Sequence, residues 1–200
     1  VDDYGEAAYV VDTILQLVAS QQFLASDCAV MYRTNAQSRL LEEAFLQARQ
    51  PYRLVGAQRF YGRKEVKDII AYLRLVYNPS DEISLERVIN VPTRGIGEKS
   101  FQSLVSAARQ AKLQAASLLF DLGRADKSLF WGQFSSRSAG QLSNFGSMLA
   151  TWISLKESYT VTELFDRILE DVKFQDYITE DGTEESQERW ENVLELRRLT

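Results

Sequence analysis

The feature that most constrains this chain is a short turn, Gly95-Ile96-Gly97, set between two segments with helical patterns. The surrounding stretch reads LERVINVPTRGIGEKS over Leu85–Ser100. Glycine has no Cβ and reaches positive φ without a clash, so this turn can be tight and can lie close to another surface. The apolar Ile96 is expected to plug the turn into the core. The pattern predicts a helix-hairpin-helix-like arrangement.

The second helix of this pair is expected to begin near Glu98 and to expose its first backbone amides. These amides lack intrahelical partners, and the helix dipole favours an anion beside them. Arg94 and Lys99 flank this end, so a nucleic-acid phosphate is the natural ligand. The alternative is an ordinary connector between two helices, with its charges solvated.

The nearby Gly97-Glu98-Lys99-Ser100 resembles the end of a nucleotide-binding P-loop but does not complete one. That loop requires G-x-x-x-x-G-K-[ST], whereas Glu98 here separates the glycine from the lysine, and no glycine stands at the required place before Gly97. No other Gly-Lys pair occurs in the chain. We therefore expect no ATP-hydrolysing site and no catalytic residue in these 200 residues.

Composition limits the remaining chemistry. The chain has no histidine and one cysteine, Cys28, so it has no His-based catalysis, no histidine metal ligand and no internal disulfide. Cys28 lies in an apolar run and is expected to be a buried hydrophobe; no metal site is expected. No apolar run is long enough for a bilayer, so we expect no membrane partner and a cytoplasmic protein. Because the chain opens at Val1, we expect a fragment or a processed chain.

The net charge of −5 is unevenly distributed. Residues 1–27 carry five acidic residues and no basic one, and residues 160–200 are also strongly acidic. Basic residues exceed acidic ones in both 28–100 and 101–159. Phosphate attraction is screened within roughly 10 Å at physiological salt, so this local excess matters more than the acidic total.

The beginning of the chain alternates helical and extended patterns. Helical patterns cover Glu6–Ala19 and Gln37–Arg49, and each is followed by a segment expected to be a strand, Cys28–Arg33 and Tyr52–Val55. This order is typical of a parallel α/β sheet. Two strands are too few for a stable sheet, so this part is expected to belong to a larger domain.

The rest of the chain is expected to be helical. The boundary is drawn near Gly56–Arg59, which gives a small α/β portion at 1–57 and a helical domain at 58–200. Gly123–Ser138 is expected to be a mobile loop, and Thr160 or Thr162 to cap a helix. The helices are predicted over Lys64–Tyr77, Ser84–Asn90, Glu98–Ala111, Gln114–Leu122, Ala139–Tyr159, Val161–Val172 and Glu184–Leu199. The fold class is therefore mainly α with a small α/β portion.

Two further stretches suggest contacts with nucleic acid. The first expected strand runs straight into Arg33, Thr34 and Asn35, which places them at the sheet edge where α/β proteins bind ligands. The alternative is that Asn35 caps a helix and Arg33 forms a surface salt bridge. Gly56–Asp68 mixes Phe60 and Tyr61 with several cations, a combination that suits single-stranded nucleic acid. The alternative there is that Phe60 lies in the core and the charges form a solvated helix face.

Together, YRTNAQSRLLEEAF, PYRLVGAQRFYGRKEVKDIIAYLRLVYNP and RVINVPTRGIGEKS resemble the UvrD/PcrA/Rep-like superfamily 1 DNA helicases in order and spacing. The resemblance is specific over residues 28–104 and looser to Thr200. It implies a partial RecA-like motor domain, 2A, followed by a helical insertion domain, 2B. It also implies that Arg33, Thr34 and Asn35 lie in helicase motif IV and, with Lys67, contact single-stranded DNA. Duplex contacts are implied for Thr93, Arg94, Gly95, Ile96, Gly97, Lys99 and Ser100.

The resemblance further implies an ATP-dependent 3′-to-5′ DNA helicase as the parent protein. ATP and Mg²⁺ would serve the parent, whereas no cofactor is expected in the fragment. The implied partners are DNA, the rest of the helicase chain and repair or replication proteins. Two alternatives remain: a helix-hairpin-helix duplex-binding module of another repair protein, and a protein-interaction piece that uses the acidic helix Glu184–Leu199.

Overall fold

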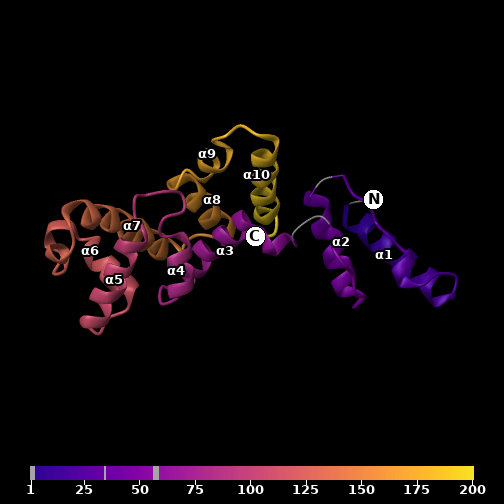
Figure 1. The fold of residues 1–200 in the computed structure, drawn as a ribbon, viewed down its shortest axis with the longest axis horizontal. Coiled ribbons are helices and arrows are strands. Elements are labelled where there is room, and N and C mark those ends of the chain that lie inside the picture. Colours follow the sequence, from indigo (N-terminus) through magenta and orange to yellow (C-terminus); the bar gives the residue numbers. More distant parts are fainter. Residues whose placement is uncertain (1–2, 34, 56–58) are drawn as a thin grey trace. The chain divides into compact units, whose positions relative to one another are not determined.

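The computed structural model describes residues 3–33, 35–55 and 59–200, and regular secondary structure in these ranges is entirely helical (Figure 1). The chain divides into two compact units, Val1–Val66 and Lys67–Thr200. The division falls inside helix α3, which runs over Lys64–Tyr77. No helix in the described ranges is both long and apolar enough to cross a membrane.

The first unit is built on two helices, α1 (Asp3–Ala19) and α2 (Asn35–Gln47), which pack against each other. Ala7 and Val11 of α1 are buried. Two 3₁₀ turns, η1 (Ala25–Asp27) and η2 (Phe60–Gly62), and the beginning of α3 also belong to this unit, and η2 contacts α2.

The two strands expected in this unit are not formed within the described residues. Cys28–Arg33 and Tyr52–Val55 carry no strand assignment. Met31 is 96% exposed and Val55 80% exposed, and Cys28 is half-buried rather than part of the core. A β-strand forms only when its main chain makes hydrogen bonds to a neighbouring strand, and an apolar run in the sequence does not show that such a strand is present. The prediction of an α/β portion is therefore wrong for the described residues, whose regular structure in this unit is helical.

The second unit contains most of α3 and all the later helices. Two 3₁₀ turns, η3 (Ala125–Lys127) and η4 (Trp131–Gln133), lie in the segment that the sequence predicts to be a mobile loop. The further helices are α4 (Glu82–Val88), α5 (Glu98–Gln110), α6 (Ala115–Leu122), α7 (Ser136–Leu155), α8 (Val161–Asp171), α9 (Phe174–Thr179) and α10 (Glu184–Arg197). The prediction for α3 is confirmed at both ends, the others are confirmed with shifted bounds, and α9 was missed.

The core of this unit forms where α6 and α7 pack most extensively. Gly146 of α7 lies directly against the main chain of Leu119 in α6. Farther along α7, Trp152 is fully buried, meets the ring of Tyr72 edge-on at 5.7 Å and donates from Nε1 to Asp171 at 2.9 Å. The core thus joins α3, α6, α7 and α8.

Thr160 caps α8, as the sequence predicted for Thr160 or Thr162. Its hydroxyl accepts from the Glu163 amide at 3.2 Å, and the Glu163 carboxylate accepts from the Thr160 amide at 2.7 Å. These bonds from Thr160 hold the pKa of Glu163 below its ordinary value. The capping box therefore fixes where α8 begins.

Replacing Thr160 with alanine should lower the free energy of unfolding by about 1 kcal/mol, because the first turn of α8 loses a side-chain acceptor. Urea unfolding followed by tryptophan fluorescence would measure the change. Thr162→Ala is the control, since that hydroxyl takes no part in the cap. Equal losses for the two variants would show that the cap contributes nothing specific.

Candidate nucleic-acid interface

The Gly-Ile-Gly turn connects α4 to α5 in the second unit. Gly95 has φ +74°, in the left-handed region that favours glycine. Gly97 has φ −75° and ψ 174°, an extended conformation, and stands as the N-cap of α5. Ile96 is 2% exposed, so the prediction that it plugs the turn into the core is confirmed. Positive φ is thus needed only at the first glycine.

Asn90 holds the turn from within. Its side-chain oxygen accepts from the amide of Arg94 at 2.8 Å and from the amide of Ile96 at 3.1 Å. Two main-chain donors of the turn are therefore satisfied by one side chain, which fixes the path of the chain between them.

The side chain of Arg94 faces into the unit. Its Nη1 donates to carbonyls at and after the end of α4, and its Nη2 donates to the Tyr72 hydroxyl at 2.6 Å. The guanidinium also lies over the Phe145 ring, 5.2 Å from its centroid. The carbonyl partners are Val88 at 3.0 Å, Val91 at 3.0 Å, Pro92 at 3.2 Å and Ile89 at 3.4 Å. This placement differs from the expected outward cation: the guanidinium faces inward, where several main-chain carbonyl oxygens converge at the end of α4.

Tyr72 completes this arrangement from α3. Its side chain is fully buried, and its hydroxyl donates toward the carbonyls of Val91 and Val88. Burial, which outweighs the nearby Arg94, raises the pKa of Tyr72 to about 12. The hydroxyl is therefore neutral at ordinary pH and can both donate to a carbonyl and accept from Arg94.

The outer side of the turn carries the remaining expected duplex-binding residues. Thr93, Gly97 and Lys99 are exposed, and Ser100 is half-buried with its hydroxyl 3.4 Å from that of Ser138. In the described part of the chain, Lys99 has no ion pair. Glu98 is also exposed beside it, and its carboxylate accepts from Gln102 at 2.7 Å. The surface thus offers one free ammonium with the first amides of α5, next to one carboxylate.

The residues expected to contact single-stranded DNA belong to different units. Arg33 is exposed in the first unit, and its amide donates to the Gln37 side chain at 3.0 Å. Thr34 lies outside the described residues. Asn35 begins α2. Lys67 is exposed on α3, in the second unit.

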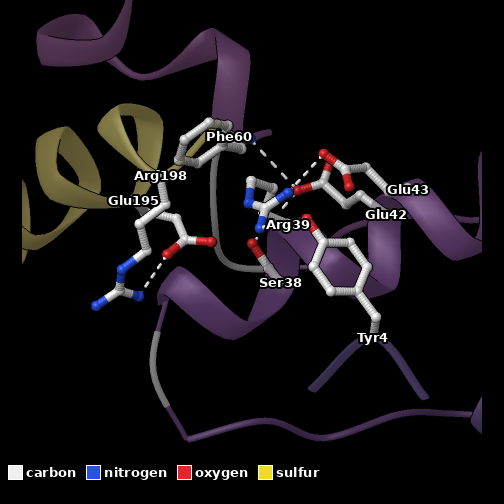
Figure 2. Close-up of polar contacts among 8 residues, drawn as sticks. All are labelled: Tyr4, Ser38, Arg39, Glu42, Glu43, Phe60, Glu195 and Arg198. Atoms are coloured by element: carbon white, nitrogen blue, oxygen red, sulfur yellow. Dashed lines mark hydrogen bonds and ion pairs between the residues drawn. The ribbon is translucent and has the colours of Figure 1, made fainter. Parts of the chain in front are cut away.

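A buried polar cluster, absent from the sequence predictions, fixes the helix that follows Arg33 (Figure 2). Ser38, Arg39 and Glu42 of α2 are all at least nine-tenths buried. One Glu42 oxygen accepts from the Phe60 amide at 3.3 Å and from the Ser38 hydroxyl at 3.3 Å. Arg63 donates to the Ser38 hydroxyl at 3.0 Å. These bonds tie α2 to the chain around η2.

Aromatic rings surround the same cluster. Arg39 pairs with Glu43 at 2.7 Å and lies over the rings of Tyr4 and Phe60 (Figure 2). The Tyr52 hydroxyl donates to Glu42 at 3.0 Å; burial, followed by this bond, raises the pKa of Tyr52. Phe60 is 1% exposed, so for this residue the core alternative holds rather than stacking on a base.

No group of three or more carboxylate or thiol side chains capable of holding a metal ion occurs within residues 3–33, 35–55 and 59–200.

Comparison with known proteins identifies the family of this chain. A sequence model of the UvrD-like helicase C-terminal domain matches residues 2–200. The chain belongs to this family. This UvrD-like chain is 37% identical over its whole length to the ATP-dependent DNA helicase PcrA of Bacillus subtilis. It is 40% identical over 85% of its length to PcrA of Staphylococcus aureus, and 39% identical over 96% to PcrA of Staphylococcus epidermidis.

The UvrD-like chain spans about a quarter of each relative: 26% of the Bacillus subtilis protein, 22% of the Staphylococcus aureus protein and 25% of the Staphylococcus epidermidis protein. The comparisons therefore identify the family to which residues 2–200 belong.

Proposed function

We propose that this chain is the DNA-contacting middle of an ATP-dependent 3′-to-5′ DNA helicase. The family match and the PcrA relatives support the class of protein. The whole protein would use ATP and Mg²⁺, while these 200 residues contribute DNA contacts and no ATP-hydrolysing site, since they contain no P-loop. DNA is the principal partner, alongside the rest of the helicase chain and repair or replication proteins.

In this proposal the second unit corresponds to domain 2B and touches duplex DNA through the Gly-Ile-Gly turn. The observation that carries it is the outward face of the turn, where the exposed Lys99 and the first amides of α5 lie together above the buried Ile96. Amides and an ammonium bind phosphate oxygens without reading base edges. The contact should therefore be independent of DNA sequence.

The first unit, in the same proposal, is part of motor domain 2A and grips single-stranded DNA. Arg33 is exposed at the approach to α2, whose position the buried Glu42 cluster fixes. Its guanidinium can bind a phosphate in a forked geometry. Asn35 and Thr34 follow it in sequence, and Lys67 on α3 adds a further cation. ATP-driven closure of the motor domains would then move one strand past these residues.

Removing the charge of Lys99 tests the duplex contact. Lys99→Gln should reduce the slope of log affinity against log salt concentration by about one unit, because one fewer phosphate is neutralised. Fluorescence anisotropy of a labelled duplex from low to moderate salt would measure the slope.

The matched control is Arg109→Gln, which removes an exposed charge from the other end of α5. The control should leave the slope unchanged. If the two variants give the same slope as the unaltered protein, the turn is only a connector between helices. A second duplex of unrelated sequence should give the same affinities throughout.

A further inference from the structure

The side chain of Arg94, expected to face DNA, points into the unit instead, and this orientation suggests a different role. We infer that Arg94 and Tyr72 are positioning residues, which hold the Gly-Ile-Gly turn in its DNA-binding conformation without touching DNA. The inference rests on the proposed duplex contact and deepens it. It separates the residues that meet phosphate from those that shape the turn.

The first support is the set of inward bonds made by the two terminal nitrogens of the Arg94 guanidinium. Nη1 lies within 3.2 Å of three main-chain carbonyl oxygens, and Nη2 lies 2.6 Å from the Tyr72 hydroxyl. Aromatic faces of Phe145 and Tyr72 lie 5.2 and 5.8 Å from its central carbon, an arrangement that favours a cation. Contact with a phosphate through Nη1 would compete with these carbonyl oxygens for the same hydrogens.

The second support is the position of Tyr72, which is fully buried and has no route to DNA. Its hydroxyl joins three parts of the unit: α3, on which it stands, the carbonyls that follow α4, and Arg94. Its ring packs edge-on against Trp152 of α7. A rigid core helix thereby dictates where the main chain runs just before Gly95.

The third support comes from the inner amides of the turn. The amides of Arg94 and Ile96 both donate to Asn90, which lies between the Arg94-bound carbonyls of Ile89 and Val91. The hydrogen bonds of Asn90, Arg94 and Tyr72 thus lie on the inner side of the turn and support its outer side, from Gly95 to Lys99. An arginine suits this task because its planar fork reaches several acceptors at once, which a lysine ammonium does not reproduce.

The test compares Tyr72→Phe and Arg94→Gln with Tyr77→Phe, a control on the same helix whose side chain is 84% exposed. Tyr72→Phe removes one buried hydroxyl and changes no charge. We expect both test variants to weaken duplex binding by roughly tenfold, as for loss of a hydrogen bond to a charged group. The double variant should be no weaker than Arg94→Gln alone, since both break one network. Single-strand binding should be unchanged.

Hydrogen–deuterium exchange in the absence of DNA gives the second readout. The amides of Arg94 and Ile96 should exchange faster by at least about tenfold in both test variants, and at the unaltered rate in Tyr77→Phe. Tryptophan fluorescence confirms that each variant is folded. Tyr72→Phe keeps the packed ring and provides the decisive result if Arg94→Gln does not fold.

Two results would overturn the inference. One is unchanged exchange in Tyr72→Phe. The other is a salt slope reduced by about one unit in Arg94→Gln while Tyr72→Phe binds duplex normally, which would mean that Arg94 contacts phosphate directly. A third result separates the two proposals: the amides exchange faster in the test variants, but Lys99→Gln does not change duplex binding. That result would contradict the proposed function, and it would still show that Arg94 and Tyr72 stabilise the turn.

Discussion

Replacing Gly146 with alanine should lower the free energy of unfolding of the second unit by about 3 kcal/mol, at the upper end of overpacking effects. A Cβ built there lies 2.9 Å from the carbonyl carbon of Leu119 and closer still to its oxygen. These are main-chain atoms inside α6, so no side chain can rotate away. The helices α6 and α7 must separate, and the melting temperature should fall by roughly 6–12 °C.

Gly140→Ala is the matched control, because it lies in the same helix and has open space around the added methyl group. Alanine there should be neutral or stabilising by up to about 1 kcal/mol, through the better helix propensity. All three tryptophans, Trp131, Trp152 and Trp190, lie in the second unit, so their fluorescence reports its melting alone. Similar melting temperatures for the two variants would contradict the close packing of α6 on α7.

Replacing Gly95 with alanine should weaken duplex binding by roughly tenfold. The residue has φ +74°, and an L-residue with a Cβ is strained there by about 1–2 kcal/mol. An alanine that relaxes to negative φ must recover this conformation to bind, so the strain appears as lost affinity. The added methyl group would also lie 3.0 Å from Cδ of Gln141, whose side chain must shift.

Gly182 supplies the control, since it has φ +62° in the turn before α10 and nothing near its missing Cβ. Gly182→Ala should cost a similar amount of stability and leave duplex affinity unchanged. Anisotropy of labelled duplex and urea unfolding, measured on the same samples, separate the two effects. Equal duplex affinities for both variants would show that the conformation of the Gly-Ile-Gly turn is irrelevant to binding.

Long amphipathic helices were predictable because the residues that pack against the core recur with the helical period in the local sequence. The apolar stripe of α3 indicated that helix, and the two threonines, Thr160 and Thr162, indicated the start of α8. The six-residue α9 was missed because it is too short to show a period. The strand predictions were wrong because a strand depends on a neighbouring strand, which local sequence does not reveal.

The Gly-Ile-Gly turn was predictable in its main chain and less so in its side chains. The glycines indicated a tight turn and Ile96 a buried plug, because each follows from the residue's own chemistry. The inward orientation of Arg94 depends on the hydroxyl of Tyr72, which lies 22 residues earlier. The Glu42 cluster likewise joins residues from separate segments, such as Phe60, 18 positions later. Such partners are set by packing, and a charged residue looks the same in the sequence whichever way it faces.

The irregular segments of the first unit have a consequence for how the polypeptide behaves in concentrated solution. Met31 and Val55 lie outside helices and strands, and their apolar side chains are open to water. Backbone groups outside regular structure, beside exposed apolar side chains, can pair with another chain, and native proteins normally cover or charge such segments. Self-association should therefore start from the first unit, at concentrations where the well-packed second unit is still soluble.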